Sequence, residues 1–321
     1  MAGEAKSAPD DMLLEFRTDL SHAAGQLVRL GPALDQILRA HDYPDSVSVL
    51  LGEALSLTAL LGAKLKDGGR LILQTRSDGP VSLVVAHYDA PGRMRGYASF
   101  DAEKIAALEK QGDDVGTRLL GDGQLAMTID PGGEQVSHQG IVELVDGSLT
   151  ESAHEYFRRS EQLPTFIRLA VARQYLGGQG ERAPAWHWRS AGIIVQRVPR
   201  LGGDPKPGET PEERDMRLHG EDEEDWTRVA MLAATVEAHE LIDPTLAPER
   251  LLWRLFNEEG VRAGAAMPLE AKCRCSRQRV EGFLKTFTAE ELADMRETDG
   301  RITVTCEFCS THYKFEPGEL G

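Results

Sequence analysis

The chain has 321 residues, of which 41% are hydrophobic and 6% aromatic, and its formal net charge is −16 at pH 7. This length allows one large domain and a small one. The acidic balance argues against unassisted binding to nucleic acid or to an anionic membrane, because both depend on clustered Lys and Arg. No apolar run reaches the roughly 20 residues that cross a bilayer, and residues 1–10 lack the apolar segment of a signal peptide. We therefore expect a soluble cytoplasmic protein.

The elements predicted between residues 12 and 200 indicate one α+β domain. We set its boundaries at residues 1–201. Apolar residues recur at helical spacing from Asp45 to Lys64, so a long helix is expected there. A second helix is expected to open at a capping box formed by Ser152 and Glu155 and to end before Pro164. Seven short stretches have the composition of strands: 70–74, 81–87, 94–98, 125–130, 139–144, 165–172 and 191–198. The last is almost wholly apolar, which predicts an interior strand.

Residues 202–270 are the acidic part of the chain, with 17 Asp and Glu against 7 Lys and Arg. The stretch 202–225 combines Gly, Pro and an acidic run and has almost nothing to bury, so we expect a mobile loop or linker. Beyond it, apolar spacing predicts one helix capped near Asp225 and another that begins at Pro248 and stops near Gly260. Two interpretations of these helices are open. They belong to the ordinary core, or they are buried conditionally and can be released by the loss of one stabiliser.

The four cysteines of the chain lie in two close pairs, Cys273 with Cys275 and Cys306 with Cys309. Four thiolates satisfy the tetrahedral preference of Zn²⁺ without leaving an open position, so we predict one zinc ion bound by all four. Two structural disulfides, or inert buried thiols, are the alternatives, and a reducing cytosol argues against the first. His312 stands where a substitute ligand could lie, but four thiolates already fill the coordination shell.

Residues 271–321 are predicted to form a separate zinc-binding module. A segment of this size with few large apolar residues rarely folds without a staple, and a structural zinc contributes on the order of 10 kcal/mol to folding. Oxidants attack thiolates, and the spacing within each pair allows Cys273–Cys275 and Cys306–Cys309 disulfides, which would exclude zinc. We therefore interpret the four cysteines as a redox switch whose oxidation unfolds the module.

The cysteine pattern and several further motifs resemble the heat-shock protein 33 family, the redox-regulated holdase chaperones of bacteria. The motifs extend over nearly the whole chain: 51–55 (LGEAL), 61–63 (LGA), 78–80 (DGP), 155–157 (EYF), 160–165 (SEQLPT), 255–259 (LFNEE) and 304–309 (VTCEFC). The resemblance implies that Cys273, Cys275, Cys306 and Cys309 are zinc ligands and redox-sensing thiols of an ATP-independent chaperone. It also implies that the reduced, zinc-bound form is largely inactive. Oxidation to two disulfides then releases zinc, unfolds the module and the linker, exposes apolar surface for unfolding client proteins, and favours a homodimer. We therefore expect the domain of residues 1–201 to hold the client proteins.

Two alternative functions come from other classes of protein. A thiol-disulfide oxidoreductase would use Cys306 and Cys309 catalytically, but no thioredoxin-like βαβ pattern surrounds them. A zinc ribbon could contact protein or nucleic acid, and the near-neutral charge of residues 271–321 disfavours nucleic acid. The first domain contains no Gly-x-Ser-x-Gly, no phosphate-binding Gly-rich loop with Lys, and no His-Glu-x-x-His. We therefore expect a chaperone rather than an enzyme, with zinc as its one cofactor.

Overall fold

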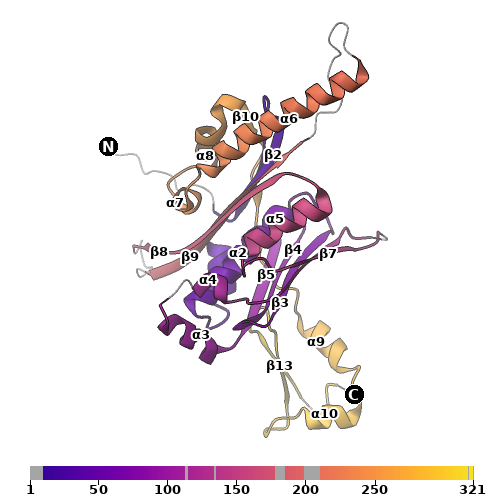
Figure 1. The fold of residues 1–321 in the computed structure, drawn as a ribbon. Coiled ribbons are helices and arrows are strands. Elements are labelled where there is room, and N and C mark those ends of the chain that lie inside the picture. Colours follow the sequence, from indigo (N-terminus) through magenta and orange to yellow (C-terminus); the bar gives the residue numbers. More distant parts are fainter. Residues whose placement is uncertain are drawn as a thin grey trace, which may run out of the picture.

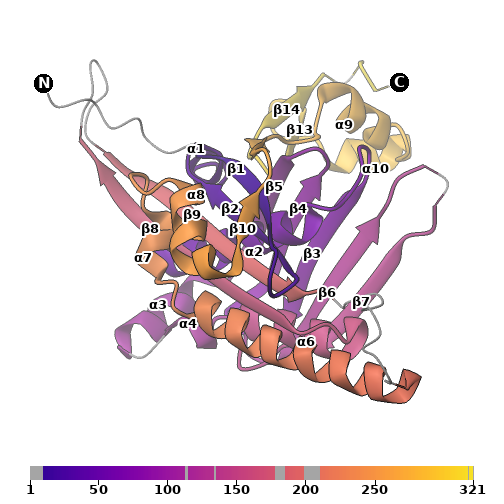
Figure 2. The ribbon, with the colours of Figure 1, turned by 90° about the horizontal axis from the view of Figure 1, so that it is seen from above.

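Two sheets on either side of a long helix organise the fold (Figures 1 and 2). The computed structural model describes residues 10–112, 115–133, 135–177, 185–198, 210–316 and 318–320. Helices lie between and outside the sheets, and a small C-terminal module carries a hairpin of its own. The predicted α+β class is therefore confirmed.

The first sheet has the strand order β10-β1-β2-β9-β8, and β11 also pairs with β1. Its strands are β1 (Met12–Thr18), β2 (Ala23–Leu30), β8 (Thr165–Leu176), β9 (Ala185–Arg197), β10 (Val261–Ala263) and β11 (Met267–Pro268). The predicted interior strand is confirmed as β9, which pairs antiparallel with both β2 and β8. Successive residues of β9 alternate between two buried faces. Ile194 packs toward the centre of the molecule, whereas Ile193 and Val195 pack on the outer face.

The second sheet has the strand order β12-β5-β4-β3-β6-β7. Its strands are β3 (Arg70–Ser77), β4 (Val81–Asp89), β5 (Arg93–Phe100), β6 (Gly123–Asp130), β7 (His138–Glu143) and β12 (Glu270–Ala271). The strands predicted between residues 70 and 144 are confirmed. β12 comes from far along the chain and pairs parallel with β5, so the segment that leads into the cysteines is joined to this sheet.

Helix α2 (Asp45–Gly62) fills the space between the two sheets, and it confirms the long helix predicted from Asp45. Gly62 is needed near its end, because a Cβ there would lie 2.4 Å from the ring of Tyr88 on β4. α2 is long and apolar enough to cross a membrane, yet 72% of that window is buried inside the protein. It is therefore a core helix, which explains why apolar residues occur on all of its sides.

The smaller helices flank this core: α1 (Pro32–Leu38), α3 (Ala102–Lys110), α4 (Val115–Arg118), α5 (Leu149–Tyr156) and a π-helical turn η1 (Phe157–Glu161). Helix α5 corrects one prediction, because it begins after Ser148 and not at Ser152. The Ser148 hydroxyl accepts a hydrogen bond from the backbone N–H of Glu151. Ser152 lies inside the helix, where its hydroxyl donates to the carbonyl of Ser148 at 2.6 Å.

The acidic stretch also differs from its prediction, because residues 211–225 belong to a 24-residue helix, α6 (Pro211–Ala234), and not to a loop. Thr210, and not Asp225, caps this helix in a capping box with Glu213. Acidic residues favour the positive end of the helix dipole, and pairs such as Arg217–Glu221 at 3.2 Å support the exposed turns. Capping and charge pairs thus replace the apolar burial that this stretch lacks. Residues 202–209 lie outside the described residues.

Helices α6, α7 (Ala238–Ile242) and α8 (Pro248–Phe256), with the 3-10 turn η2 (Asn257–Glu259), cover the outer face of the first sheet (Figures 1 and 2). We call residues 210–259 the linker layer. Its buried apolar residues pack on β1, β2, β8 and β9: Val229, Ala233, Val236, Leu241, Leu251, Leu252, Leu255 and Phe256. Phe256 stacks on Phe16 of β1 with 5.4 Å between ring centroids. α8 begins at Pro248 as predicted. The turn η2 that follows is terminated by Gly260, whose φ is +71°.

The C-terminal module contains α9 (Arg277–Leu284), α10 (Ala289–Asp294), β13 (Ile302–Thr305) and β14 (His312–Phe315). It projects from the second sheet, on the side of the molecule away from the linker layer (Figure 1). Its core consists of a few buried apolar residues: Leu284, Leu292, Ile302, Phe315 and Leu320. So small a core gives little folding free energy, as is usual for modules that rely on a further stabiliser.

Candidate metal centre

The structure brings all four cysteines to one point. Cys273 and Cys275 follow β12, and Cys306 and Cys309 lie in the tight turn between β13 and β14. The four Sγ atoms lie within 4.8 Å of one another, with 3.6 Å between Cys273 and Cys306 and 3.4 Å between Cys275 and Cys309. The turn is fixed by the backbone N–H of Ser310, which donates to the carbonyl of Cys306 at 2.8 Å.

This geometry fits a tetrathiolate metal site. The edges of a tetrahedron with zinc–sulfur bonds of 2.3 Å are about 3.8 Å long, close to the observed separations. A disulfide would need about 2.05 Å, and all four thiols are free. Among the described residues the group contains cysteines alone. The expected alternative ligand, His312, is engaged elsewhere, with its Nδ1 atom 2.8 Å from the hydroxyl of Thr305.

The thiols of the cluster differ in acidity. Burial alone would raise the pKa of Cys309, but hydrogen bonds from the hydroxyl and the backbone N–H of Thr311 lower it to about 7. Burial raises the pKa of Cys275 to about 12, although the Tyr313 hydroxyl donates to its Sγ atom at 3.1 Å. Cys309 thus ionises more readily than Cys275, and a bound cation would favour deprotonation of the whole cluster.

Phe308 connects the cysteine cluster to the second sheet. It lies between Cys306 and Cys309 in sequence, and its ring packs against His87 and Tyr97, with centroid distances of 5.2 and 4.9 Å. The guanidinium of Arg95 lies 4.0 Å from the ring centroid, a cation–π contact. Burial, followed by the nearby charge of Arg95, lowers the pKa of His87 to about 4, so this histidine is neutral at pH 7. The aromatic side chain therefore docks on a preformed surface of β4 and β5.

Polar and backbone contacts extend this docking. The backbone N–H of Lys272, one residue before the first cysteine, donates to the carbonyl of Met94 on β5 at 2.9 Å. The Arg274 guanidinium lies 3.5 Å from the Asp89 carboxylate on β4. The hydroxyl of Ser310 lies 3.3 Å from Nδ1 of His41. Contacts to the rest of the protein therefore lie directly beside both cysteine pairs.

Comparison with known proteins identifies the family. The Hsp33 protein family matches residues 11–316. The chain is 43% identical over 309 residues to the 33 kDa chaperonin of Caulobacter vibrioides, across 96% of this chain and 95% of that protein. It is 35% identical over 306 residues to the 33 kDa chaperonin of Nitrosococcus oceani, across 95% of this chain and 91% of that protein. The chain belongs to the Hsp33 family.

A crystal structure of the 33 kDa chaperonin of Thermotoga maritima supports the fold of this Hsp33 chain. It aligns over 97% of this chain and 96% of the other with a TM-score of 0.72, and at 23% identity the likeness concerns the fold alone. The family resemblance predicted from the sequence is confirmed, and Hsp33 proteins are chaperones rather than enzymes.

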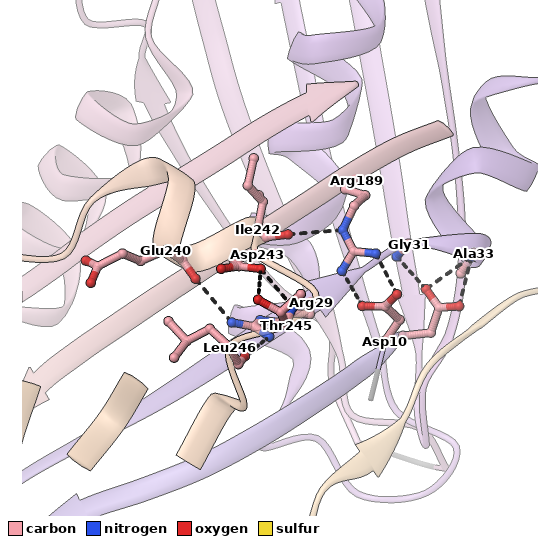
Figure 3. A network of polar contacts seen from close by, with 11 residues as sticks. Asp10, Arg29, Gly31, Ala33, Arg189, Glu240, Ile242, Asp243, Thr245 and Leu246 are labelled. Atoms are coloured by element: carbon pink, nitrogen blue, oxygen red, sulfur yellow. Dashed lines mark hydrogen bonds and ion pairs between the residues drawn. The ribbon is translucent and has the colours of Figure 1, made fainter. Parts of the chain in front are cut away.

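Buried arginines clamp the linker layer of this Hsp33 chain to the first sheet (Figure 3). Arg29 on β2 is completely buried and donates to the carbonyls of Leu246 at 2.6 Å and Glu240 at 3.2 Å. Burial lowers the pKa of Arg29 to about 10, so it stays charged at neutral pH. Arg189 on β9 donates to the carbonyl of Ile242 at 3.1 Å and pairs with Asp10. The carbonyls at the end of α7 are therefore satisfied by the sheet beneath them.

Two further contacts hold the ends of the layer. Arg168 on β8 donates to the carbonyl of Val236 at 2.7 Å. Arg228 on α6 donates to the buried carboxylate of Glu259 at 2.5 Å. The hydrogen bond from Arg228 raises the acidity of Glu259, so its pKa is lower than that of a free glutamate. These residues are not evident from the sequence, because an isolated arginine on a strand or a helix carries no local signal of its partner.

Proposed function

We propose that this protein is an ATP-independent holdase chaperone gated by the oxidation state of Cys273, Cys275, Cys306 and Cys309. In the reduced state these four thiolates hold one Zn²⁺, which supplies the cross-links that the module's own core is too small to provide. The observation that carries the proposal is the convergence of four free thiols in a module with a few buried apolar residues. The name shared by its relatives, 33 kDa chaperonin, points to the same class of activity.

Oxidation removes the metal donors in pairs. Two equivalents of peroxide convert Cys273 with Cys275, and Cys306 with Cys309, into two disulfides. Each pair of thiolates gives up two electrons as its S–S bond forms, and each peroxide takes up these electrons and two protons to leave as two water molecules. All four sulfur atoms lie within 4.8 Å, so distance alone does not select the pairing. In an unfolded module, closing a ring across about thirty residues costs more chain entropy than closing one within a pair. Without thiolates the module loses its metal, and we infer that it unfolds.

We further propose that the client-binding surface is the outer face of the first sheet. The apolar residues of β1, β2, β8 and β9 are covered there by the linker layer. The half of α6 before Trp226 is acidic, with five consecutive acidic residues at 221–225. Their mutual repulsion makes the layer's closure easier to reverse. Unfolding proteins are the expected clients, and the exposed apolar face favours a homodimer in the active state.

The domain division follows from this mechanism. Residues 1–201 would hold clients, residues 202–270 would act as a metastable linker, and residues 271–321 would sense oxidants. Two observations support it: the module has a separate core, and the linker layer shares its core with the outer face of the first sheet. We expect the protein to act in the cytoplasm, where a reducing environment keeps the thiols ready to bind zinc, and to need no nucleic acid or membrane partner.

A peroxide titration at mildly raised temperature tests the proposal. Zinc release is followed with a metal-binding chromophore, and holding activity is followed as suppressed aggregation of a chemically unfolded client. We expect both to rise together and to reverse when reductant and zinc are restored. If zinc leaves and no holding activity appears, the metal is only a structural staple and the proposed gating is wrong.

A further inference from the structure

A cationic cavity lies where the C-terminal module meets the second sheet. Its volume is about 450 Å³, and it opens beside Cys273. Its charged lining comes from both sides of the junction: Arg70, Asp89 and Arg93 from the second sheet, and Lys272, Arg274 and Arg279 from the module. The proposed redox chemistry makes no use of these six side chains.

The lining of the cavity carries a surplus of positive charge. Five cations face one carboxylate, although the whole chain has a formal net charge of −16. Asp89 is shared, with Nε of Arg70 at 2.6 Å and the Arg274 guanidinium at 3.5 Å. Lys272 has a carboxylate partner outside the lining, Glu270 at 3.6 Å. Arg279 donates to the backbone carbonyl of Arg274 at 2.8 Å, which places these two guanidinium-bearing residues beside each other.

The positive charges also face each other across the junction between the second sheet and the module. Arg70 and Arg93 belong to β3 and β5, whereas Arg274 and Arg279 belong to the module. Residues 272–279 contain four of the eight cations of residues 271–321 and no carboxylate. Docking of the module therefore concentrates like charges, which opposes the docked state unless an anion neutralises them. A zinc tetrathiolate carries a charge of about −2, which offsets only part of this surplus.

We propose that this cavity binds an anion with a chain of two or more phosphoryl groups, and that the bound anion holds the module against the second sheet. Planar guanidinium groups pair with phosphate oxygens through two parallel hydrogen bonds. The volume is that of a site for a small ligand, and a single phosphate would leave much of it empty. Several arginines around one space favour an elongated polyanion over a monovalent ion.

The ligand would act on the switch through its preference for the docked state. Each side of the junction supplies only part of the cationic lining, so the undocked protein offers an incomplete site. A ligand that binds one state stabilises that state in proportion to its concentration relative to its dissociation constant. On the basis of the proposed function, such an anion raises the threshold at which the linker layer is released.

Calorimetric titration of the reduced, zinc-loaded full chain tests the site at constant ionic strength and without magnesium. Inorganic tripolyphosphate is the first probe, and ATP tests whether a nucleoside is accepted on the same phosphate chain. We expect one site per chain, with affinity weakened about tenfold or more by Arg274→Gln or by Arg93→Gln. The matched control is Arg17→Gln, which removes the same charge from an exposed position on β1.

Arg93 is exposed, so its replacement leaves the fold intact and keeps the test meaningful if Arg274→Gln loosens the module. Zinc content is measured after each titration, because tripolyphosphate can itself bind the metal. Equal affinity of all three variants, or no binding above that of sulfate, would show that the cations serve only the zinc tetrathiolate and would overturn the proposal.

Hydrogen exchange on the reduced protein provides the second readout. We expect tripolyphosphate to slow exchange in residues 270–279 and 306–311, and the Arg93→Gln variant to lose most of this protection. Neither experiment uses oxidant or client, so a failed redox-chaperone proposal would leave these results unchanged. Binding without any protection of these segments would contradict the role in docking.

Discussion

Arg29→Met tests whether the linker layer is held down by the sheet beneath it. The side chain is fully buried and donates two hydrogen bonds to carbonyls of the layer, at Leu246 and Glu240. Methionine keeps much of the volume but leaves both carbonyls without a donor. A hydrogen bond from a charged donor contributes about 1.5–3 kcal/mol, and relief of the buried charge offsets part of the loss. We expect the free energy that holds residues 240–246 on the sheet to fall by about 2–4 kcal/mol.

Such a loss raises the open population of this segment about 30- to 700-fold. Amide hydrogen exchange of α7 and α8 in the reduced, zinc-loaded protein measures it directly. Arg17→Met, an exposed arginine on the neighbouring strand, is the matched control and should leave exchange unchanged. Exchange in α7 and α8 that is the same in both variants would refute the clamp. Faster exchange without any suppression of client aggregation would instead refute our placement of the client surface.

Three further outcomes are expected. Phe308→Ala should keep stoichiometric zinc but lose about 1–2 kcal/mol of docking free energy, seen as faster amide exchange in β5; unchanged exchange would count against the aromatic contact. Cys306→Ser should lose zinc and the module's thermal transition without oxidant, and retention of both would contradict the ligand assignment. Because Arg228 lowers the pKa of Glu259, this pair stabilises the linker layer above about pH 4.3 and loses its effect as pH falls through the lower folded-state pKa. Glu259→Gln should abolish that part of the acid sensitivity, measured by helix content, and an unchanged acid transition would show that the pair is not responsible.

The sequence predicts elements whose signal is local. α2 and the strands between residues 70 and 144 have strong apolar periodicity or clear turns, and the two cysteine pairs follow a metal-ligand spacing that needs no tertiary information. β1 is missed because apolar residues 12–14 run together before the alternation of Glu15, Phe16 and Arg17. Two of its partner strands, β10 and β11, lie far along the chain. Both faces of β1 are buried, and this becomes evident only when the sheet is known.

The α6 error has a different origin. The acidic run lacks apolar residues, and this absence predicted a loop, while the signal for a helix start was present in Thr210, Pro211 and Glu213. Capping and charge pairing outweighed composition there. Phe308 was overlooked for the opposite reason, because a single aromatic residue in a metal-binding turn carries no sign of the surface on which it docks.

The module and the linker layer contact different sheets, and one route between them is the chain that connects them. That chain, residues 260–272, is paired with both sheets: β10 and β11 pair with β1, and β12 pairs with β5. Its last bonded residue, Lys272, directly precedes the first cysteine. In the proposed mechanism, loss of the metal would free the segment from its cysteine end, at the two-residue strand β12. β11 and β10 would loosen next, and both pair with β1, whose Phe16 stacks on Phe256 of the linker layer. Unfolding of the module would thus remove support from the outer face of the first sheet through this chain, although the module and the linker layer pack in separate cores.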